Sequence, residues 1–164
     1  MDPEKMLVGR HKKVAFMDAD GKGTTYTRMT GFTSLSEGKN SIDSRQYVDE
    51  ASERSDVVGY SPAIDYELDR YTNDPVHEKI ATITDDEIVG TDAQVSIVVV
   101  DLFDQKTSET TCTARKRLWS VIPDTEGDGT DALIYKGSFK AAGEIVKGTA
   151  TTTDGWKTCT FSEA

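Results

Sequence analysis

The chain has 164 residues, an apolar share of 36 % and a formal net charge of −10. This length suits one domain with a real core, and the low apolar share suggests an extended shape whose surface is partly covered on assembly. The acidity argues against sequence-independent binding of nucleic acid by lysine and arginine. The longest apolar run, residues 95–100 with Ser96 inside it, is too short to span a bilayer.

The chain begins with a polar segment, MDPEKMLVGRHKK, which lacks the apolar stretch and cleavage site of a signal peptide. We expect residues 1–12 to form a flexible N-terminal arm. We also expect the protein to be made and kept in the cytosol, unless a larger particle carries it out. A short strand over residues 13–17 and a turn over residues 18–23 should follow. The β-branched and aromatic residues at 24–35 predict the next strand.

A long polar stretch, residues 36–59, separates two segments that have the pattern of sheet. It mixes acidic and basic side chains with isolated apolar ones, whereas linkers of this length favour Gly, Ser and Pro or one sign of charge. A loop this long usually serves a function or is disordered. We interpret it as a projecting strand-loop-strand arm that becomes ordered against a neighbouring subunit, with a solvated loop as the alternative. The candidate inter-subunit contact residues are Arg45, Tyr47, Asp49, Arg54, Val57 and Val58.

Residues 63–71 alternate between a mainly apolar face and an acidic face, which is the period of a β-strand. The acidic face consists of Asp65, Glu67 and Asp69. A helix should follow, because Asn73 and Asp74 are capping residues and proline at position 75 suits a first turn. Apolar side chains then recur at helical spacing until a glycine at position 90 ends the run.

From residue 94 onward the pattern is that of strands separated by turns rich in glycine and aspartate. We expect a hairpin of strands 94–103 and 110–122, an acidic loop over residues 123–131, and three further strands over residues 132–142, 144–150 and 156–161. The sequence therefore predicts one mainly β domain, residues 1–164. Its architecture should be a β-sandwich or barrel with one short flanking α-helix and a long projecting loop.

No motif for catalysis or cofactor binding is found, so we expect no enzyme activity, no cofactor and no metal. Residues 18–24, DADGKGT, resemble the start of a calcium loop, but its twelfth position is Met29 instead of an acid, which favours a plain turn. The acidic loop over residues 123–131 is likewise interpreted as solvated. Cys112 and Cys159 lie in predicted strands and are interpreted as buried thiols, with a disulfide as the alternative.

Arg115, Lys116 and Arg117 form a basic cluster in this acidic chain. Two interpretations stay open. The charges lie on an exposed edge strand and deter unwanted pairing, or they dock on an acidic patch of an identical neighbour.

Four long phrases of the sequence resemble one family. They are SRQYVDE, then SDVVGYSPAIDYELDRYTNDPVHEKIATITDDE, then IPDTEGDGTDA and the closing GTATTTDGWKTCTF. In these phrases the chain is similar to the major tail (tail tube) proteins of long-tailed phages and prophages of Gram-positive bacteria. The resemblance runs from about residue 13 to residue 161 and does not extend over the first ten residues.

The resemblance implies a β-sandwich or barrel subunit that forms hexameric rings, which stack into the hollow tube through which the genome leaves. The implied partners are the protein itself and the tape measure, tail terminator and distal tail or baseplate proteins. DNA would pass through without specific binding, in a virion tail assembled in the host cytoplasm. We nominate Asp65, Glu67 and Asp69 as lumen-lining, because an acidic wall repels phosphates. An ordinary outer face is the alternative.

Two other classes of function would require features of their own. A ligand- or carbohydrate-binding β-sandwich module of a virion would need exposed aromatic side chains grouped in loops. A hydrolase would need Asp124, Asp128 and a metal to form a site.

Overall fold

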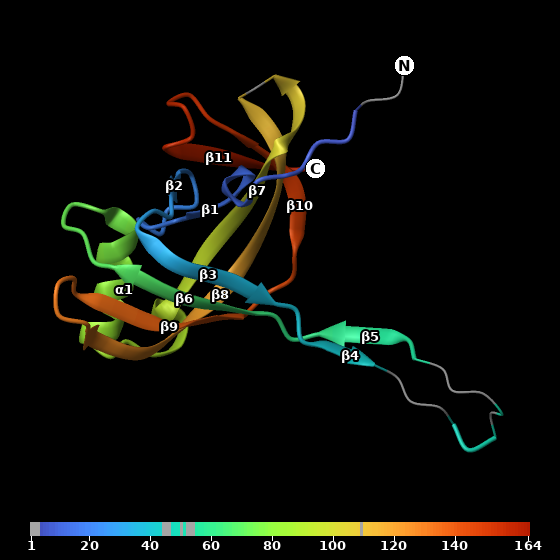
Figure 1. Cartoon of the computed structure of the whole chain (residues 1–164), viewed down its shortest axis with the longest axis horizontal. Helices are drawn as coiled ribbons and strands as arrows, with labels where there is room; N and C mark the ends of the chain where they lie inside the picture. The colour runs from blue at the N-terminus through green and yellow to red at the C-terminus, as the bar shows by residue number, and fades with distance from the viewer. Residues whose placement is uncertain (1–3, 44–46, 50, 52–54, 109) are drawn as a thin grey trace.

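The computed structural model describes residues 4–43, 47–49, 51, 55–108 and 110–164 (Figure 1). The elements of its first half are the short 3-10 helix Arg10–Lys12, β1 Lys13–Met17, β2 Tyr26–Arg28, β3 Phe32–Gly38, β4 Ser41–Asp43, β5 Val57–Tyr60, β6 Ala63–Asp69 and α1 Pro75–Asp85. The second half contains the 3-10 helix Gly90–Ala93, β7 Gln94–Ser108, β8 Thr111–Asp128, β9 Ile134–Ala141, β10 Val146–Thr151 and β11 Thr158–Glu163.

Six of these strands close into a barrel, which confirms the predicted fold class. They follow one another in the order β10, β11, β2, β1, β7 and β8, and a pairing between β8 and β10 closes the ring. Each strand contributes buried side chains to the barrel interior, namely Val14, Phe16, Tyr26, Val98, Val100, Cys112, Ala114, Ala150 and Cys159.

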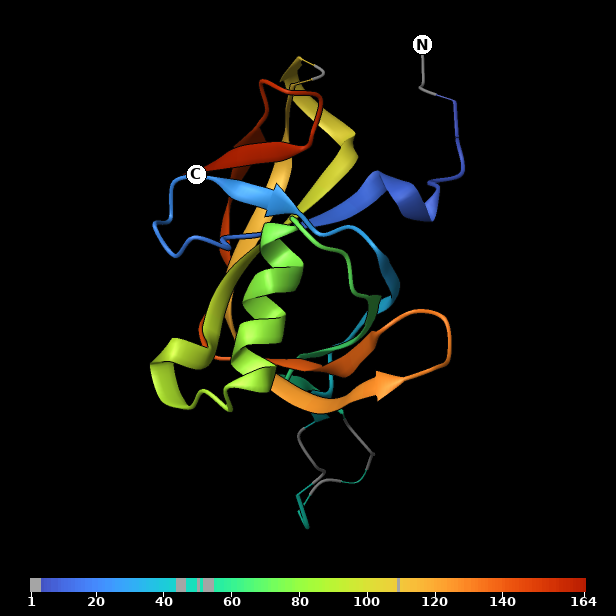
Figure 2. The same cartoon turned by 90° about the vertical axis from the view of Figure 1, so that its left-hand side faces the viewer.

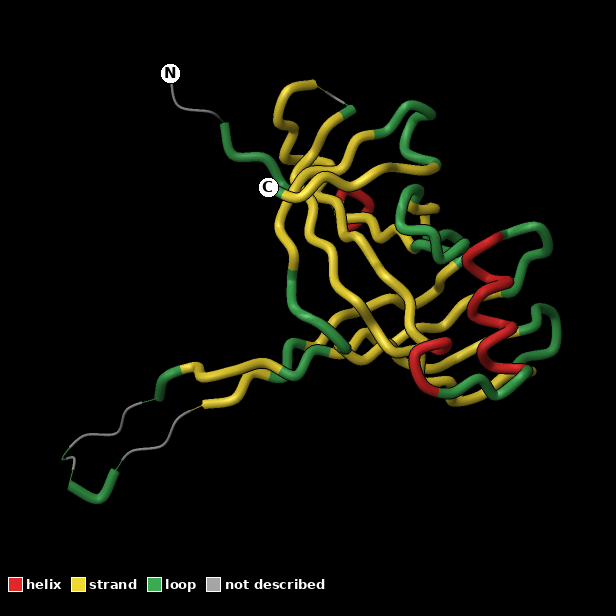
Figure 3. Tube along the Cα trace, turned by 180° about the vertical axis from the view of Figure 1, so that it is seen from behind, coloured by secondary structure: helices red, strands yellow, loops and turns green. Residues whose placement is uncertain are grey.

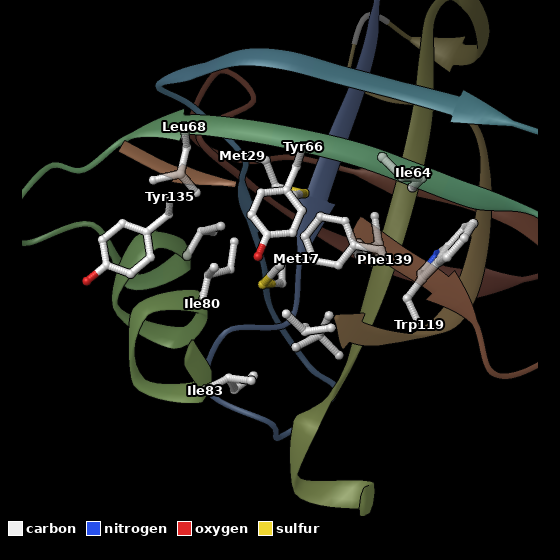
Figure 4. Packing of buried hydrophobic residues seen from close by; sticks show 14 of the residues in the cluster. Met17, Met29, Ile64, Tyr66, Leu68, Ile80, Ile83, Trp119, Tyr135 and Phe139 are labelled. Carbon is white, nitrogen blue, oxygen red and sulfur yellow. The ribbon is translucent and has the colours of Figure 1, made fainter. Parts of the chain in front are cut away.

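The other half of the molecule is an open sheet covered by α1. Beyond the barrel, β8 continues and pairs with β9, which is followed by β6 and then by β3 at the edge. Figure 2 shows α1 lying across this half, and Figure 4 shows Ile80 and Ile83 of the helix pointing toward the sheet. The rings of Tyr66 and Phe139 lie 4.7 Å apart in this second core.

Strand β7 forms part of the wall between the two cores. Val98 and Val100 point into the barrel, while Val95 and Ile97 point into the core under α1. Strand β1 is shared in the same way. Because β7 is buried on both faces here, it has a near-continuous apolar run instead of alternating polar residues.

The predicted helix is present but shorter than its sequence pattern suggested. Asp74 is the N-cap, and its side chain accepts hydrogen bonds from the backbone N–H groups of Val76 and His77 at 3.0 and 3.3 Å. The helix ends at Asp85 rather than near Gly90. A left-handed residue, Glu87 with φ of 51°, already turns the chain before that glycine.

Two of the strand boundaries predicted from the sequence were wrong. The expected strand over residues 24–35 is interrupted before β3, where Gly31 has a φ of +77°. The expected loop over residues 123–131 is largely strand, because β8 runs on to Asp128. Proline 123 is tolerated there since the pairing of β8 with β7 ends at Ser120, so that beyond this point only β9 is a partner.

Candidate assembly interface

The predicted arm is a two-stranded hairpin that projects from the body. Strands β4 and β5 pair with each other, with Ser41 opposite Tyr60 and Ile42 opposite Gly59, and they belong to no other sheet among the described residues. Figures 1 and 3 show the arm extending from one end of the molecule, with α1 at the other. An isolated two-stranded hairpin is marginal in water and offers unpaired edges. This arm therefore has the properties of a segment that is completed by a partner.

The root of the arm is fixed by a pair of hydrogen bonds. The backbone N–H of Ser61 donates to the carbonyl of Asn40 at 3.2 Å, and the side-chain amide of Asn40 donates to the carbonyl of Ser61 at 2.9 Å. Asn40 adopts the left-handed conformation, with φ of 48°, that asparagine tolerates better than most residues. These bonds hold the two ends of the arm together where it leaves the body.

The arm carries large apolar side chains that no part of the described chain covers. Tyr47, Val57 and Val58, which were predicted as contact residues, are 65, 56 and 63 % exposed. Asp49 is exposed at the tip, whereas Arg45 and Arg54 lie outside the described residues. Ile42 and Tyr60 add exposed apolar surface to the hairpin itself. Tyr60 was not among the predicted contacts, because the predicted arm ended at residue 59.

The nominated carboxylates on β6 share the face opposite the second core, as their alternation predicted. Asp65 is exposed, and Glu67 and Asp69 are partly buried. Glu67 lies 3.9 Å from the ammonium group of Lys136 on the neighbouring strand β9. The acidic side chains are therefore mixed with a basic one on this face, and their place in a lumen stays a prediction.

A groove of about 1190 Å³ lies beside the edge strand β3 and was not predicted from the sequence. Its lining includes the apolar side chains of Leu35, Ile64, Ile97 and Trp119. The arginine and lysine residues that line it are Arg10, Lys13, Arg28, Lys39, Arg115, Lys116 and Arg117, whereas Glu37 is its one acidic lining residue among those described. The groove is thus a basic region of an acidic protein.

The basic cluster at residues 115–117 belongs to this groove and does not lie on an edge strand. Arg115 is paired on one side with Val99 of β7 and on the other with Lys147 of β10, so the edge-strand interpretation is wrong. Its guanidinium lies 3.2 Å from Asp101. Arg117 lies over the ring of Trp119, at 5.7 Å from the ring centre. The docking interpretation stays a prediction.

The segment that resembled a calcium loop is a turn held by its own carboxylates. Asp18 accepts a hydrogen bond from the backbone N–H of Gly23, and Asp20 accepts one from that of Lys22, both at 2.9 Å. Burial and the adjacent Asp20 raise the pKa of the Asp18 carboxyl above its usual value. Within the described part of the chain, no group of three or more His, Cys, Asp or Glu side chains is arranged to hold a metal ion.

The two cysteines are free thiols inside the barrel, as the sequence predicted. Burial raises the pKa of the Cys159 thiol to about 12, which keeps it protonated and unreactive. No helix in the described ranges has the length and apolarity needed to cross a membrane.

No family model matches the chain, and no curated protein matches it. Among solved structures, the chain is similar to a chain of one described as "Cryo-EM structure of the anti-feeding prophage (AFP) baseplate, 6-fold symmetrised". The two chains are 8 % identical with a TM-score of 0.49, and the similarity covers 88 % of this chain and 97 % of the other.

Proposed function

We propose that the protein is a structural virion protein that polymerises as stacked hexameric rings into a phage tail tube, the conduit for genome ejection. The projecting β4–β5 hairpin is the observation that carries this proposal. A hairpin with exposed Ile42, Val57 and Val58 gains stability only when a partner covers it. The family resemblance of the sequence supplies the kind of assembly, in which identical subunits cover one another's arms.

The charge of the chain fits a conduit for DNA. A net charge of −10 gives a surface that repels phosphates, with the repulsion screened over about 8–10 Å at physiological salt. In this proposal DNA slides past carboxylates such as Asp65 without being held. The further partners are the tape measure, tail terminator and distal tail or baseplate proteins, and the protein lies in the virion tail after assembly in the host cytoplasm.

The proposal assigns the chain no enzymatic role. In the alternative of a ligand- or carbohydrate-binding module, exposed aromatic side chains would line a recognition surface. The exposed Tyr47 and Tyr60 instead lie on the arm, where they suit contact with protein.

Negative-stain electron microscopy of the concentrated purified protein tests the proposal. We expect rings or tubes with six subunits per ring, and a sedimentation profile that shifts to larger species as concentration rises. A protein that stays monomeric at high concentration and binds an oligosaccharide would contradict the tail tube and favour the carbohydrate-binding alternative.

A further inference from the structure

The barrel is closed, but the other half of the sheet stays open between β1 and β3, and the groove lies at this opening. Strand β3 pairs only with β6 among the described strands, and the start of β1 pairs only with β7, so the two strands face each other across a gap. Arg10 spans this gap, donating hydrogen bonds to the carbonyls of Lys13 at 2.7 Å and of Leu35 at 2.9 Å. Open strand edges of this kind accept an added strand.

The rim of the groove is short of anionic partners. Within the described ranges, no carboxylate forms an ion pair with Arg28, Lys116 or Arg117. The Nε atom of Arg117 is buried and has no hydrogen-bond acceptor in the described part of the chain. A buried donor without an acceptor is costly, and an incoming carboxylate or carbonyl would satisfy it.

The arm carries the complementary chemistry. Residues 41–60 contain five acidic and two basic residues, and the hairpin adds exposed valines and tyrosines suited to an apolar floor. The N-terminal segment is the other exposed extended part of the chain, with Met6 and Leu7 in the open. Its residues 4–13 contain four lysines and arginines against one glutamate, so the same basic rim would repel it.

We propose that the groove between β1 and β3 of one copy receives the β4–β5 arm of another copy. The carboxylates of the arm meet the basic rim, and its apolar side chains cover the floor around Leu35 and Trp119. Figures 1 and 3 show the arm directed away from the body, so it reaches a second copy rather than its own groove. This inference rests on the proposed self-assembly and names the receiving site.

Complementation between two full-length variants tests the pairing. The first, an acceptor, keeps the groove and has residues 41–60 replaced by an Asp-Gly turn between Asn40 and Ser61. The second, a donor, keeps the arm and carries Arg28→Glu and Lys116→Glu in the groove. We expect each variant alone to sediment as a monomer, and an equimolar mixture to form a 1:1 complex that goes no further. Circular dichroism checks that both variants are folded.

The affinity of the two variants for each other should depend on the apolar and charged contacts of the arm with the groove. Val57→Asp in the donor should weaken it about tenfold, and raising the salt from about 50 to 500 mM should weaken it further. As the matched control, Lys140→Glu with Lys147→Glu makes the same charge change on exposed residues outside the groove. This control should self-associate like the unmodified protein.

Two results would overturn the pairing. One is a mixture that stays monomeric while the unmodified protein assembles, which would place the arm on another surface and leave the tail tube proposal standing. The other is a labelled oligonucleotide that binds the acceptor and is released by Lys116→Glu, which would make the groove a nucleic-acid site. A 1:1 complex with no rings from the unmodified protein would support the pairing and contradict the tail tube.

Discussion

The imidazole of His77 lies 2.6 Å from the carbonyl oxygen of Thr30 through its Nε2 atom. Its Nδ1 atom accepts a hydrogen bond from the backbone N–H of Tyr71 at 3.0 Å, so Nε2 carries the proton and donates to Thr30. The ring is fully buried and lies 5.7 Å from that of Phe32. His77 thereby joins the start of α1 to the turn before β3 and to the end of β6.

Replacing this histidine should cost much of the stability of the fold. His77→Ala leaves a cavity and two unpaired backbone groups, and we expect a loss of about 3 kcal/mol in the free energy of unfolding. Urea titration followed by circular dichroism measures it. The exposed His11 is the matched control, because His11→Ala should change stability by less than about 0.5 kcal/mol. Equal effects of the two substitutions would show that the bonds of His77 contribute little.

Alkaline pH should destabilise the protein through two buried groups, the Tyr66 hydroxyl and the Cys159 thiol. Burial raises the pKa of Tyr66 and of Cys159 to about 12, from ordinary values of 10.0 and 9.0. A folded-state pKa above the unfolded one gives stability that is fully present below about pH 9 and is lost as the pH rises toward 12. Thermal melts at pH 7 to 11 should show this fall. Tyr66→Phe keeps the ring and removes the titrating hydroxyl, so its decline should be shallower.

Shortening the arm should separate folding from assembly. Replacing residues 41–60 by an Asp-Gly turn keeps the hydrogen-bonded pair of Asn40 and Ser61 and removes only residues that lie outside both cores. We expect an unchanged melting temperature within about 2 °C and no tubes in micrographs. Normal tubes from this variant would show that the arm takes no part in assembly.

The arginines of the arm lie outside the described residues and are tested through their charge. An acidic protein offers carboxylates for bidentate pairing, so Arg45→Glu and Arg54→Glu should each weaken assembly, measured as the protein concentration needed for tubes. The expected shift is about tenfold for each reversal. Ser41→Ala, at the start of the same arm, should leave that concentration unchanged. Reversals that behave like the serine variant would show that both arginines are solvated.

The lumen assignment predicts an effect on DNA passage and none on the fold. With Asp65, Glu67 and Asp69 replaced by lysine, tubes should still form, because all three lie off the buried face of β6. Ejection from particles built with this variant should slow, and added salt should relieve it, since each phosphate contact is salt-sensitive. The neutral replacements Asn, Gln and Asn are the control. Unimpaired ejection with lysine would place this face on the outside of the tube.

Much of the fold could be predicted because local patterns and tertiary structure agree. The alternation of Ile64, Tyr66 and Leu68 is seen as one buried face of β6, and Asp74 with Pro75 begins α1. The strand through Pro123 could not be predicted. A proline fits there only because β8 no longer pairs with β7 at that point and pairs with β9 alone. Local sequence carries no such information.

The candidate site was predicted only in its projecting half. Exposed apolar residues in a polar stretch indicated the arm, whereas the groove brings together residues from six separate strands and the segment before β1. Arg10 and Leu35 meet across 25 positions of sequence. This contact depends on where the sheet stays open, and the periodicity of the sequence carries no information about that.

The barrel and the open sheet share strands β1, β7 and β8. This sharing affects how the protein unfolds under heat or force. Neither half has a complete set of strands of its own, so the barrel cannot lose β7 without exposing the core under α1. We therefore expect calorimetry to show a single transition, and amide protons of β7 to exchange only through global opening. In the proposed tail tube, such a subunit would keep its shape under load and lose it only in one step.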